Sequence, residues 1–262
     1  MSFYDSLFEI STPLLFVFSI GALVALSAVS AGCALLVLRV WPSKPGATMV
    51  ATTLTGFLTP AALMIAFISN EVWTVEGKAQ TATDREGIAV AEVLRLSDHL
   101  PDAQAGTMRR ALLEYADSVV RYDWPAMDRD TVSPHTDEAF YKLRNALYVM
   151  RQANDATLNP TLEAIQAQLN SIAENKESRR VIAKHRVSGI KWTMMAVLLM
   201  VSAYILVELH RPHRREMLLS LGLFCAGFGS ICFLILMYDR PFAGVTRIEP
   251  VQIEQVLQAE AG

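Results

Sequence analysis

Four long apolar stretches, with one long polar segment between the second and the third, constrain this chain more than any other feature of its sequence. They are residues 14–38, 47–69, 192–209 and 217–238, and their only charged residue is Glu208, near the end of the third. A helix needs about 20 apolar residues to cross the hydrocarbon core of a bilayer. The sequence therefore predicts an all-α membrane protein with four transmembrane helices in two pairs.

The composition agrees with this class and excludes others. Hydrophobic residues make up 52% of the chain and charged residues 19%, and the charges gather between residues 71 and 191. The formal net charge is −3 and no run of five like charges occurs, so nucleic acid is not an expected partner. The three cysteines lie inside apolar stretches, where they act as small apolar side chains. They are Cys33, Cys225 and Cys232.

The first apolar stretch differs from a cleavable signal sequence. Its N-terminal flank carries Asp5 and Glu9 and no basic residue, whereas a signal peptide has a positive flank and a shorter apolar core. We interpret the stretch as a retained helix. Residues 1–13, which are rich in aromatic and aliphatic side chains, are predicted to form an interfacial segment at the level of the lipid headgroups.

The polar segment has the periodicity of four amphipathic helices and no strand pattern. The predicted helices cover residues 72–100 and 102–122, and two more begin at Ser133-Pro134 and Asn159-Pro160. Short joints between them favour an antiparallel helical bundle between spans two and three. Because no proline interrupts residues 61–100 or 161–211, spans two and three are expected to continue as the first and last helices of this bundle. The predicted divisions of the chain are the interfacial segment (1–13), spans one and two (14–70), the helical bundle (71–188), spans three and four (189–238), and a C-terminal turn with a short amphipathic helix (239–262).

Small and hydroxylated residues inside the apolar stretches indicate either close helix packing or a surface that faces water. Glycine and alanine recur at four-residue spacing in spans one and four, which lets helix backbones approach closely. In span two, Thr52, Thr55 and Thr59 recur at steps of three and four, and Pro60 disturbs the hydrogen-bond ladder. These hydroxyls can either line water or bond back to their own helix, and both interpretations remain open.

No catalytic or metal-binding motif is present, so the chain is not expected to be an enzyme or to hold a cofactor. The closest approach to a metal site is His210 and His213, which lie near Glu208 and Glu216. Pro212 interrupts the helix between the two histidines, and neighbouring arginines would repel a cation. An ordinary basic loop at the membrane interface is favoured there.

Two blocks of residues carry a family resemblance. The first runs from Gly56 through Trp73 and Arg85-Glu86-Gly87 into residues 99–127, which end in Asp123-Trp124-Pro125. The second follows span four as Asp239-Arg240-Pro241-Phe242-Ala243-Gly244, with Pro250 and a short amphipathic segment after it. In this order the blocks resemble the bacterial and plant bestrophin-like domain family. Asp123 stands where that family usually has Glu, and Gly87 where it usually has Ala.

The resemblance implies a homo-oligomeric ion channel, because the family's label derives from a remote similarity to the bestrophin anion channels. Span two is then expected to line the pore, with Thr52, Thr55 and Thr59 on the wet side and Phe57 or Phe67 narrowing the path. Hydroxyls without acidic rings fit anions better than a dedicated cation filter. The expected partners are the lipid bilayer, further copies of the chain and inorganic ions. The span-end motif, Asp239, Arg240, Pro241, Phe242 and Gly244, lies either at a pore mouth or at a simple charged helix end.

Two other functional hypotheses remain open. One is a membrane-anchored helical sensor or interaction module, since a helical bundle between spans also suits partner binding. The other is a subunit of an ion-driven machine, which would need an intramembrane carboxylate, whereas Glu208 and Asp239 both lie at span ends.

The predicted location is the bacterial inner membrane, crossed several times. The side of the membrane that carries the bundle stays open, because the basic short loops and the basic run at residues 179–191 point to opposite orientations.

Overall fold

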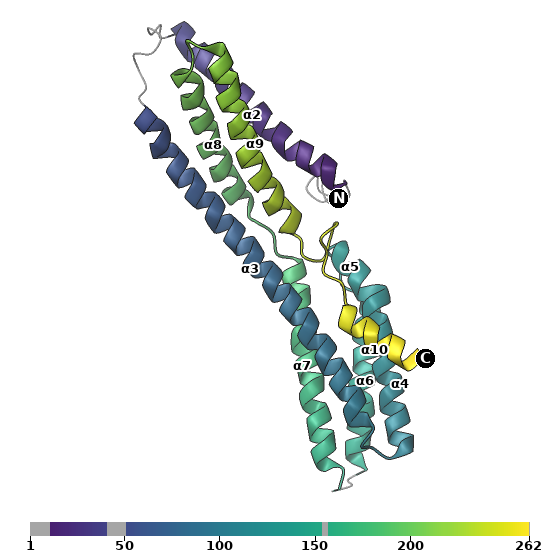
Figure 1. Ribbon diagram of the computed structural model, residues 1–262. Helices are drawn as coiled ribbons and strands as arrows, with labels where there is room; N and C mark the ends of the chain where they lie inside the picture. Colours follow the sequence, from purple (N-terminus) through teal and green to yellow (C-terminus); the bar gives the residue numbers. More distant parts are fainter. Residues whose placement is uncertain (1–10, 41–50, 154–156, 262) are drawn as a thin grey trace. The chain divides into compact units, whose positions relative to one another are not determined.

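The structure is a computed structural model that describes residues 11–40, 51–153 and 157–261. All regular secondary structure in these residues is helical (Figure 1). The predicted interfacial segment falls mainly on residues 1–10, and the start of the second apolar stretch falls on residues 47–50, so both lie outside the described residues. The chain divides into two compact units. The first comprises the described residues up to Thr74 with Arg186–Asp239, and the second comprises Val75–His185 with the described residues from Arg240 onward.

The first unit contains three helices, and the N-terminal half of a fourth, that are long and apolar enough to cross a membrane. These four, among the described residues, are α2 (Thr12–Val40), α3 (Ala51–Ser97), α8 (Gly189–Leu209) and α9 (Arg214–Tyr238). Most of the large apolar side chains on α2, such as Val17, Val29 and Leu35, are exposed. Such a surface is costly in water and suits contact with lipid, which agrees with the predicted membrane protein.

Helix α2 packs against both α8 and α9 in the first unit. A methyl group built on Gly229 of α9 would lie 2.9 Å from the Ile20 side chain and 3.1 Å from its Cα, so the two backbones meet with no room for a side chain. Ser30 of α2 donates a hydrogen bond to the Met200 carbonyl of α8 (2.9 Å). The small residues therefore serve, at least at Gly229, to pack helices within one chain.

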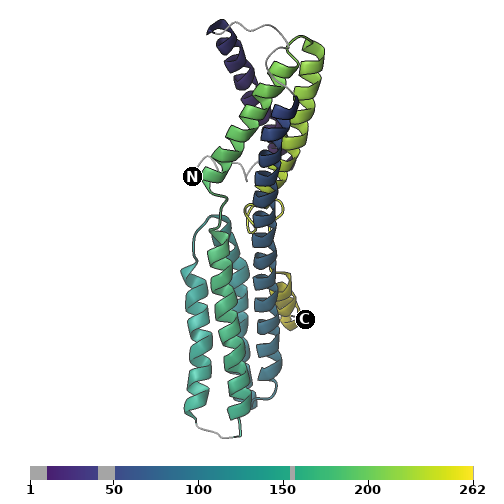
Figure 2. The same ribbon diagram turned by 90° about the vertical axis from the view of Figure 1, so that its left-hand side faces the viewer.

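The second unit surrounds an apolar core of its own. The C-terminal half of α3 is joined there by α4 (Asp102–Ser118), α6 (Pro134–Gln152) and α7 (Asn159–Ala183), which run alongside it (Figure 2). Apolar residues at helical spacing on three of these helices are buried: Leu112 and Tyr115 of α4, Leu143 of α6, and Ile165 and Leu169 of α7 are at most 1% exposed. The C-terminal segment adds α10 (Val251–Ala261), which packs against α4.

A turn of π-helix, η2 (Val119–Asp123), separates α4 from the short helix α5 (Trp124–Asp128). The Trp124 amide donates to the Val119 carbonyl five residues earlier, so the turn holds one residue more than an α-helical turn. As a result Trp124 and Asp123 are buried while Tyr122 is 48% exposed. The sequence-based prediction of one helix over residues 102–122 did not anticipate this widened turn.

Of the two predicted continuations, one is confirmed and one is wrong. Helix α3 runs without interruption from Ala51 to Ser97, with Pro60 inside it. In contrast, α7 ends at Ala183 and α8 begins at Gly189. The intervening Ser188 is extended (φ −63°, ψ 144°), and the Val187 amide donates to the Asp239 carboxylate at 2.9 Å. A side chain thus takes the hydrogen bond that a continuous helix would give to a backbone carbonyl.

Candidate functional site

The residues predicted to line a pore all lie on the apolar half of α3, and all are exposed in the single chain. They are Thr52, Thr55, Phe57, Thr59 and Phe67. Helix α3 is also the least covered of the four apolar helices. Only 17% of its most apolar window is buried, against 28% for α2, 39% for α8 and 22% for α9. A large uncovered face therefore exists in the part of the chain where the sequence predicted a pore.

The threonines lie at the centre of this uncovered face. Along α3 the fully buried positions Ala61, Ile68 and Val72 recur at helical spacing and define the covered side. At about 100° per residue, Thr52, Thr55 and Thr59 lie roughly opposite that side, within about 60° of one another. Small or polar residues continue along the same face as Ala66 and Asn70, both exposed.

The two phenylalanines predicted to narrow the path, Phe57 and Phe67, lie on different sides of α3. Phe67 is 70% exposed and lies about 80° around the helix from Thr59, at the edge of the threonine face. Phe57 is 38% exposed, but it lies about 160° from Thr59. The two phenylalanines therefore cannot narrow one path together with the threonines, and Phe67 is the better placed.

The threonine hydroxyls are engaged with their own helix. Thr59 donates to the Thr55 carbonyl at 2.9 Å, and Thr55 donates to the Ala51 carbonyl at 3.4 Å. A hydroxyl bonded in this way can still accept a hydrogen bond from water, and it can donate to another acceptor when it rotates away from its own helix.

From Arg240 onward, the span-end motif is held by polar contacts within the second unit. Arg240 donates to the Asp128 carbonyl (2.7 Å) and approaches the Asp130 carboxylate (3.5 Å), both in the second unit. Gly244 has a φ of 75°, a left-handed conformation that favours glycine. The Pro241 carbonyl accepts the Ile248 amide at 2.8 Å. These contacts turn the chain after α9 and fix it to the second unit.

The two blocks that carry the family resemblance meet inside the second unit. Phe242 of the span-end motif lies edge-on to the Trp124 ring, with centroids 5.9 Å apart and planes at 89°. The Trp124 indole N–H donates to the Ile248 carbonyl at 2.8 Å. Both rings are buried, Trp124 at 7% and Phe242 at 2% exposure. Residues about 120 positions apart in sequence therefore form one packed centre.

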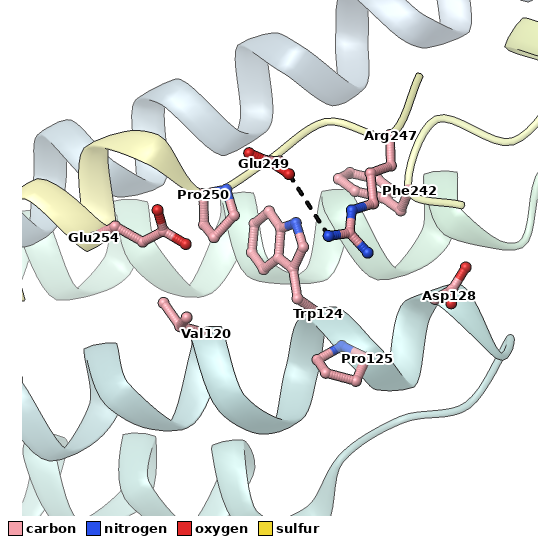
Figure 3. A pocket seen from close by; sticks show the side chains of 9 residues that line it. All are labelled: Val120, Trp124, Pro125, Asp128, Phe242, Arg247, Glu249, Pro250 and Glu254. Atoms are coloured by element: carbon pink, nitrogen blue, oxygen red, sulfur yellow. Dashed lines mark ion pairs between the residues drawn. The ribbon is translucent and has the colours of Figure 1, made fainter. Parts of the chain in front are cut away.

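A pocket of about 230 Å³ opens beside this centre (Figure 3). Its apolar wall is formed by Trp124 and Phe242, and its rim carries Arg247 and Glu249, whose charged groups lie 3.6 Å apart. In the figure Asp128 lies on the right, below Arg247, and Glu254 lies on the left. The pocket combines a small aromatic surface with exposed charges, so it is a candidate place for a small polar ligand.

Behind Trp124 lies a cluster of buried charges. Arg179 of α7 binds Glu86 of α3 through two hydrogen bonds (2.6 and 3.0 Å) and also donates to Asp123 (3.1 Å). These three side chains have no exposed surface. Arg180 donates to both Asp123 (3.0 Å) and Asp137 (2.7 Å). The cluster thus connects helices α3, α6 and α7 with the widened turn.

The cluster has no net charge, and nearly all of its charged groups have hydrogen-bond partners. Lys176 completes it by donating to Asp137 at 2.8 Å, so three acidic side chains face three basic ones. Burial lowers the pKa of Arg179, but the Glu86 and Asp123 carboxylates outweigh burial and raise it above its ordinary value. Its guanidinium also lies 4.3 Å over the Trp124 ring, a cation–π contact. A buried cluster of this kind fixes helix register and cannot lose one member cheaply.

The sequence analysis missed this cluster, although a signal was present. The α7 stripe of Leu162, Ile165, Leu169 and Ile172 continues in steps of four and three to Lys176 and Arg179. The same periodicity that predicted the apolar core therefore pointed both basic residues into it. By sequence pattern alone, Arg179 and Arg180 belong to the basic run at residues 179–191.

No group of three His, Cys, Asp or Glu side chains that could hold a metal ion occurs in the described part of the chain.

Comparison with known proteins identifies the relatives of the chain. A search of curated proteins finds no match. Among solved structures, a point mutant of a bacterial bestrophin homolog from Klebsiella pneumoniae superposes with a TM-score of 0.70 at 14% identity, covering 94% of this chain and 99% of that one. A zinc-phased structure of a homolog from the same organism gives a TM-score of 0.67 at 13% identity, covering 92% and 95%. A structure described as a membrane protein gives 0.68 at 13%, covering 93% and 96%.

These similarities show a shared fold. The model of the bestrophin-like domain matches residues 24–253, which is most of the chain and includes both sequence blocks described above. The protein therefore belongs to the bestrophin-like domain family.

Proposed function

We propose that copies of this chain assemble around a common axis and form an ion channel in which the threonine face of α3 lines the path. Membership of the bestrophin-like family supports a function of the ion-channel kind. In this proposal the four apolar helices cross the bacterial inner membrane as two pairs, with the helical bundle between spans two and three. A transport function of this kind requires no catalytic chemistry.

The main support for the proposal is that the uncovered face of α3 has hydroxyl groups at its centre. Its centre holds Thr52, Thr55 and Thr59 where a lipid-facing helix would carry large apolar side chains. Polar groups at membrane depth are tolerated where they are buried in protein or line a water-filled space. Because the single chain leaves this face open, other copies of the chain are the natural cover.

The selectivity proposed is a preference for anions. No carboxylate lies on the face from Thr52 to Ala66, and cation pores commonly use rings of carboxylates or ordered carbonyls. Threonine hydroxyls can rotate to donate to an anion, and the Asn70 amide, further along the same face, offers two more donors.

The test is electrical recording from the purified full-length protein in planar bilayers. We expect a chloride current with a reversal potential that shifts toward the chloride equilibrium value in a salt gradient. Phe67→Ala should change the conductance or gating, whereas Phe57→Ala, the matched aromatic on the other side of α3, should change little. A current carried by sodium or potassium would refute the anion preference, and equal effects of both variants would refute the assigned face.

The alternative function is a membrane-anchored sensor or interaction module without channel activity. The observation that favours it is the pocket beside Trp124 and Arg247 (Figure 3). Electrically silent bilayers that contain inserted, folded oligomer would place this alternative first. In that case, saturable binding of small charged molecules, lost in Arg247→Ala, would support it.

A further inference from the structure

The first unit contains a groove between α2, α8 and α9 that no part of the proposed channel uses. Its volume is about 340 Å³, and its wall is almost entirely apolar. The wall includes Ala22 and Leu26 of α2, Met195 and Leu199 of α8, and Cys232 of α9. Its one hydroxyl, that of Ser19, already donates to the Leu15 carbonyl at 3.0 Å. We call this feature the α2/α8/α9 groove.

The groove runs from a helix end toward membrane depth. Helix α8 has 21 residues and is therefore about 31 Å long, close to the thickness of a hydrocarbon core. Trp192 lines the groove from the first turn of α8, the level at which tryptophan is enriched beside lipid headgroups. Met195 and Leu199 lie about 4.5 and 10.5 Å deeper along the same helix. The groove lining therefore carries the amphipathic Trp192 ring at the level of the interface and apolar side chains deeper in the membrane.

Trp192 also carries an unsatisfied donor. Its indole N–H is buried and has no hydrogen-bond acceptor among the described residues. Buried N–H groups in proteins almost always have a partner, and leaving one unpaired costs about 1–3 kcal/mol. The ring forms part of the groove wall, and the one hydroxyl of that wall, on Ser19, is bonded to its own helix, so a molecule in the groove can bring the partner that the N–H lacks. The N–H itself is buried, so an acceptor in the groove reaches it only when the indole rotates.

We propose that the α2/α8/α9 groove is a binding site for a membrane phospholipid. One acyl chain lies along Leu26, Met195 and Leu199, and an ester carbonyl accepts the hydrogen bond from the Trp192 indole. A phospholipid has the polarity profile of the groove, with an acceptor at the interface and hydrocarbon below it. A helix of a second copy fits less well, because its backbone carbonyls are already bonded within the helix.

The inference depends only on insertion of the apolar helices into a membrane, and it holds whether or not the oligomer conducts ions. Lipid binding and conduction are read out separately, so a failure of one leaves the other distinguishable.

The experiment compares ester and ether lipids by native mass spectrometry of the delipidated full-length protein. The probes are dioleoyl phosphatidylglycerol and its ether-linked analogue, which keeps the chains and headgroup but lacks both ester carbonyls. We expect the wild type to bind the ester lipid roughly three- to tenfold more tightly, the value of one hydrogen bond. Trp192→Phe should bind both lipids equally, at the level of the ether lipid. Trp73→Phe, a matched change at a 52% exposed tryptophan outside the groove, should keep the wild-type ratio.

A second pair of variants tests the groove without touching the indole. Ala22→Phe fills the groove and should abolish tight binding of both lipids, whereas Ala25→Phe, on the exposed side of the same helix, should not. Equal affinity of the wild type for the two lipids, or an unchanged ratio in Trp192→Phe, would overturn the proposal. Ala22→Phe protein with normal lipid binding and a changed oligomer mass or melting temperature would assign the groove to a protein segment instead.

Discussion

The two units of this chain bury polar groups in opposite ways. The second unit encloses full charges, since Glu86, Asp123 and Arg179 have no exposed side-chain surface. Apart from the Asp239 carboxylate at its C-terminal end, the first unit encloses mainly hydroxyls: Ser19, Ser27 and Ser30 are at most 3% exposed, and the Ser19 and Ser30 hydroxyls bond to backbone carbonyls. A hydrophobic core can hold a charge cluster together, whereas helices in lipid associate through close backbone contact and small polar groups.

The largest expected effect tests the charged side of this comparison. Arg179→Met should lower the free energy of unfolding by about 3–5 kcal/mol, because Glu86 and Asp123 would remain buried without their partner. Thermal and denaturant unfolding of the full-length protein in detergent measures this loss. The matched control is Arg121→Met, which breaks the 2.6 Å ion pair with Asp117 on an arginine that is 70% exposed. That change should cost about 0–1 kcal/mol, and similar losses in the two variants would contradict a special role for the buried cluster.

Substitution of Trp124 tests whether its packing against Phe242 stabilises the second unit and its buried charge cluster. Trp124→Ala should cost about 3–5 kcal/mol, because it empties a buried ring site and leaves the Ile248 carbonyl without its donor. Trp73→Ala, at the half-exposed tryptophan, is the control and should change the melting temperature much less. Unaltered melting of Trp124→Ala would favour a binding role for this ring in place of a packing role.

Two glycines of α9 separate packing within the chain from packing between chains. Gly229→Leu should destabilise the first unit by about 1–3 kcal/mol, because its Cβ would overlap Ile20. Gly227 has open space around it, so Gly227→Leu should leave the fold intact and weaken only assembly. Melting temperature and light-scattering mass distinguish these outcomes. An unchanged oligomer mass in Gly227→Leu would move the contact between copies to another face.

In the second unit, Gly87 and Gly106 form a corresponding pair of positions. A Cβ at this position would lie 2.5 Å from the Gln252 Cβ, so Gly87→Ala should cost about 1–3 kcal/mol by pushing α10 away. Gly106 of α4 has nothing within 4 Å and is exposed, so Gly106→Ala should stabilise the chain by about 0.5–1 kcal/mol. Proteolysis of the C-terminal segment reports its release. A protected segment in Gly87→Ala would show that α10 can adjust.

The smallest effect is a pH dependence confined to the second unit. Tyr115 is fully buried and donates to Glu86 at 2.7 Å. Burial first, and then the Glu86 carboxylate, raise the pKa of Tyr115 well above its usual value near 10. A raised folded-state pKa gives stability that is complete below about pH 10 and is lost as the pH rises through the folded value. Melting temperatures of the wild type and Tyr115→Phe should therefore converge above pH 10, and a constant gap between them would contradict this assignment.

Much of the fold was predictable because long apolar runs and helical periodicity are local signals. The four apolar helices, the start of α6 at Pro134 and the start of α7 at Asn159 all follow from such patterns. Three features depended on contacts distant in sequence. The break at Ser188 depends on Asp239, the room at Gly87 depends on Gln252, and the burial of Arg179 depends on carboxylates 93 and 56 residues away.

The candidate site was predictable only in part for a related reason. Spacing placed Thr52, Thr55 and Thr59 on one face of α3, and the structure shows that face uncovered. Phe57 and Phe67 were both possible constrictions from the sequence, and the helical rotation of about 100° per residue places Phe67 nearer the threonine face than Phe57. Trp124 and Phe242 belonged to separate motifs, and only the tertiary fold brings them together.

The widened turn at η2 has a consequence for comparing and redesigning proteins of this fold. It uses one residue of chain length to rotate everything after Val119 by roughly one α-helical step, about 100°. Deleting a single residue between Val119 and Asp123 would restore an unbroken α-helix and turn the residues after it outward, although every side chain that remained was unchanged. An alignment that closes this one-residue gap would therefore equate the buried Trp124 with an exposed position, and a grafted or shortened version of this helix would lose the charge cluster without any substitution.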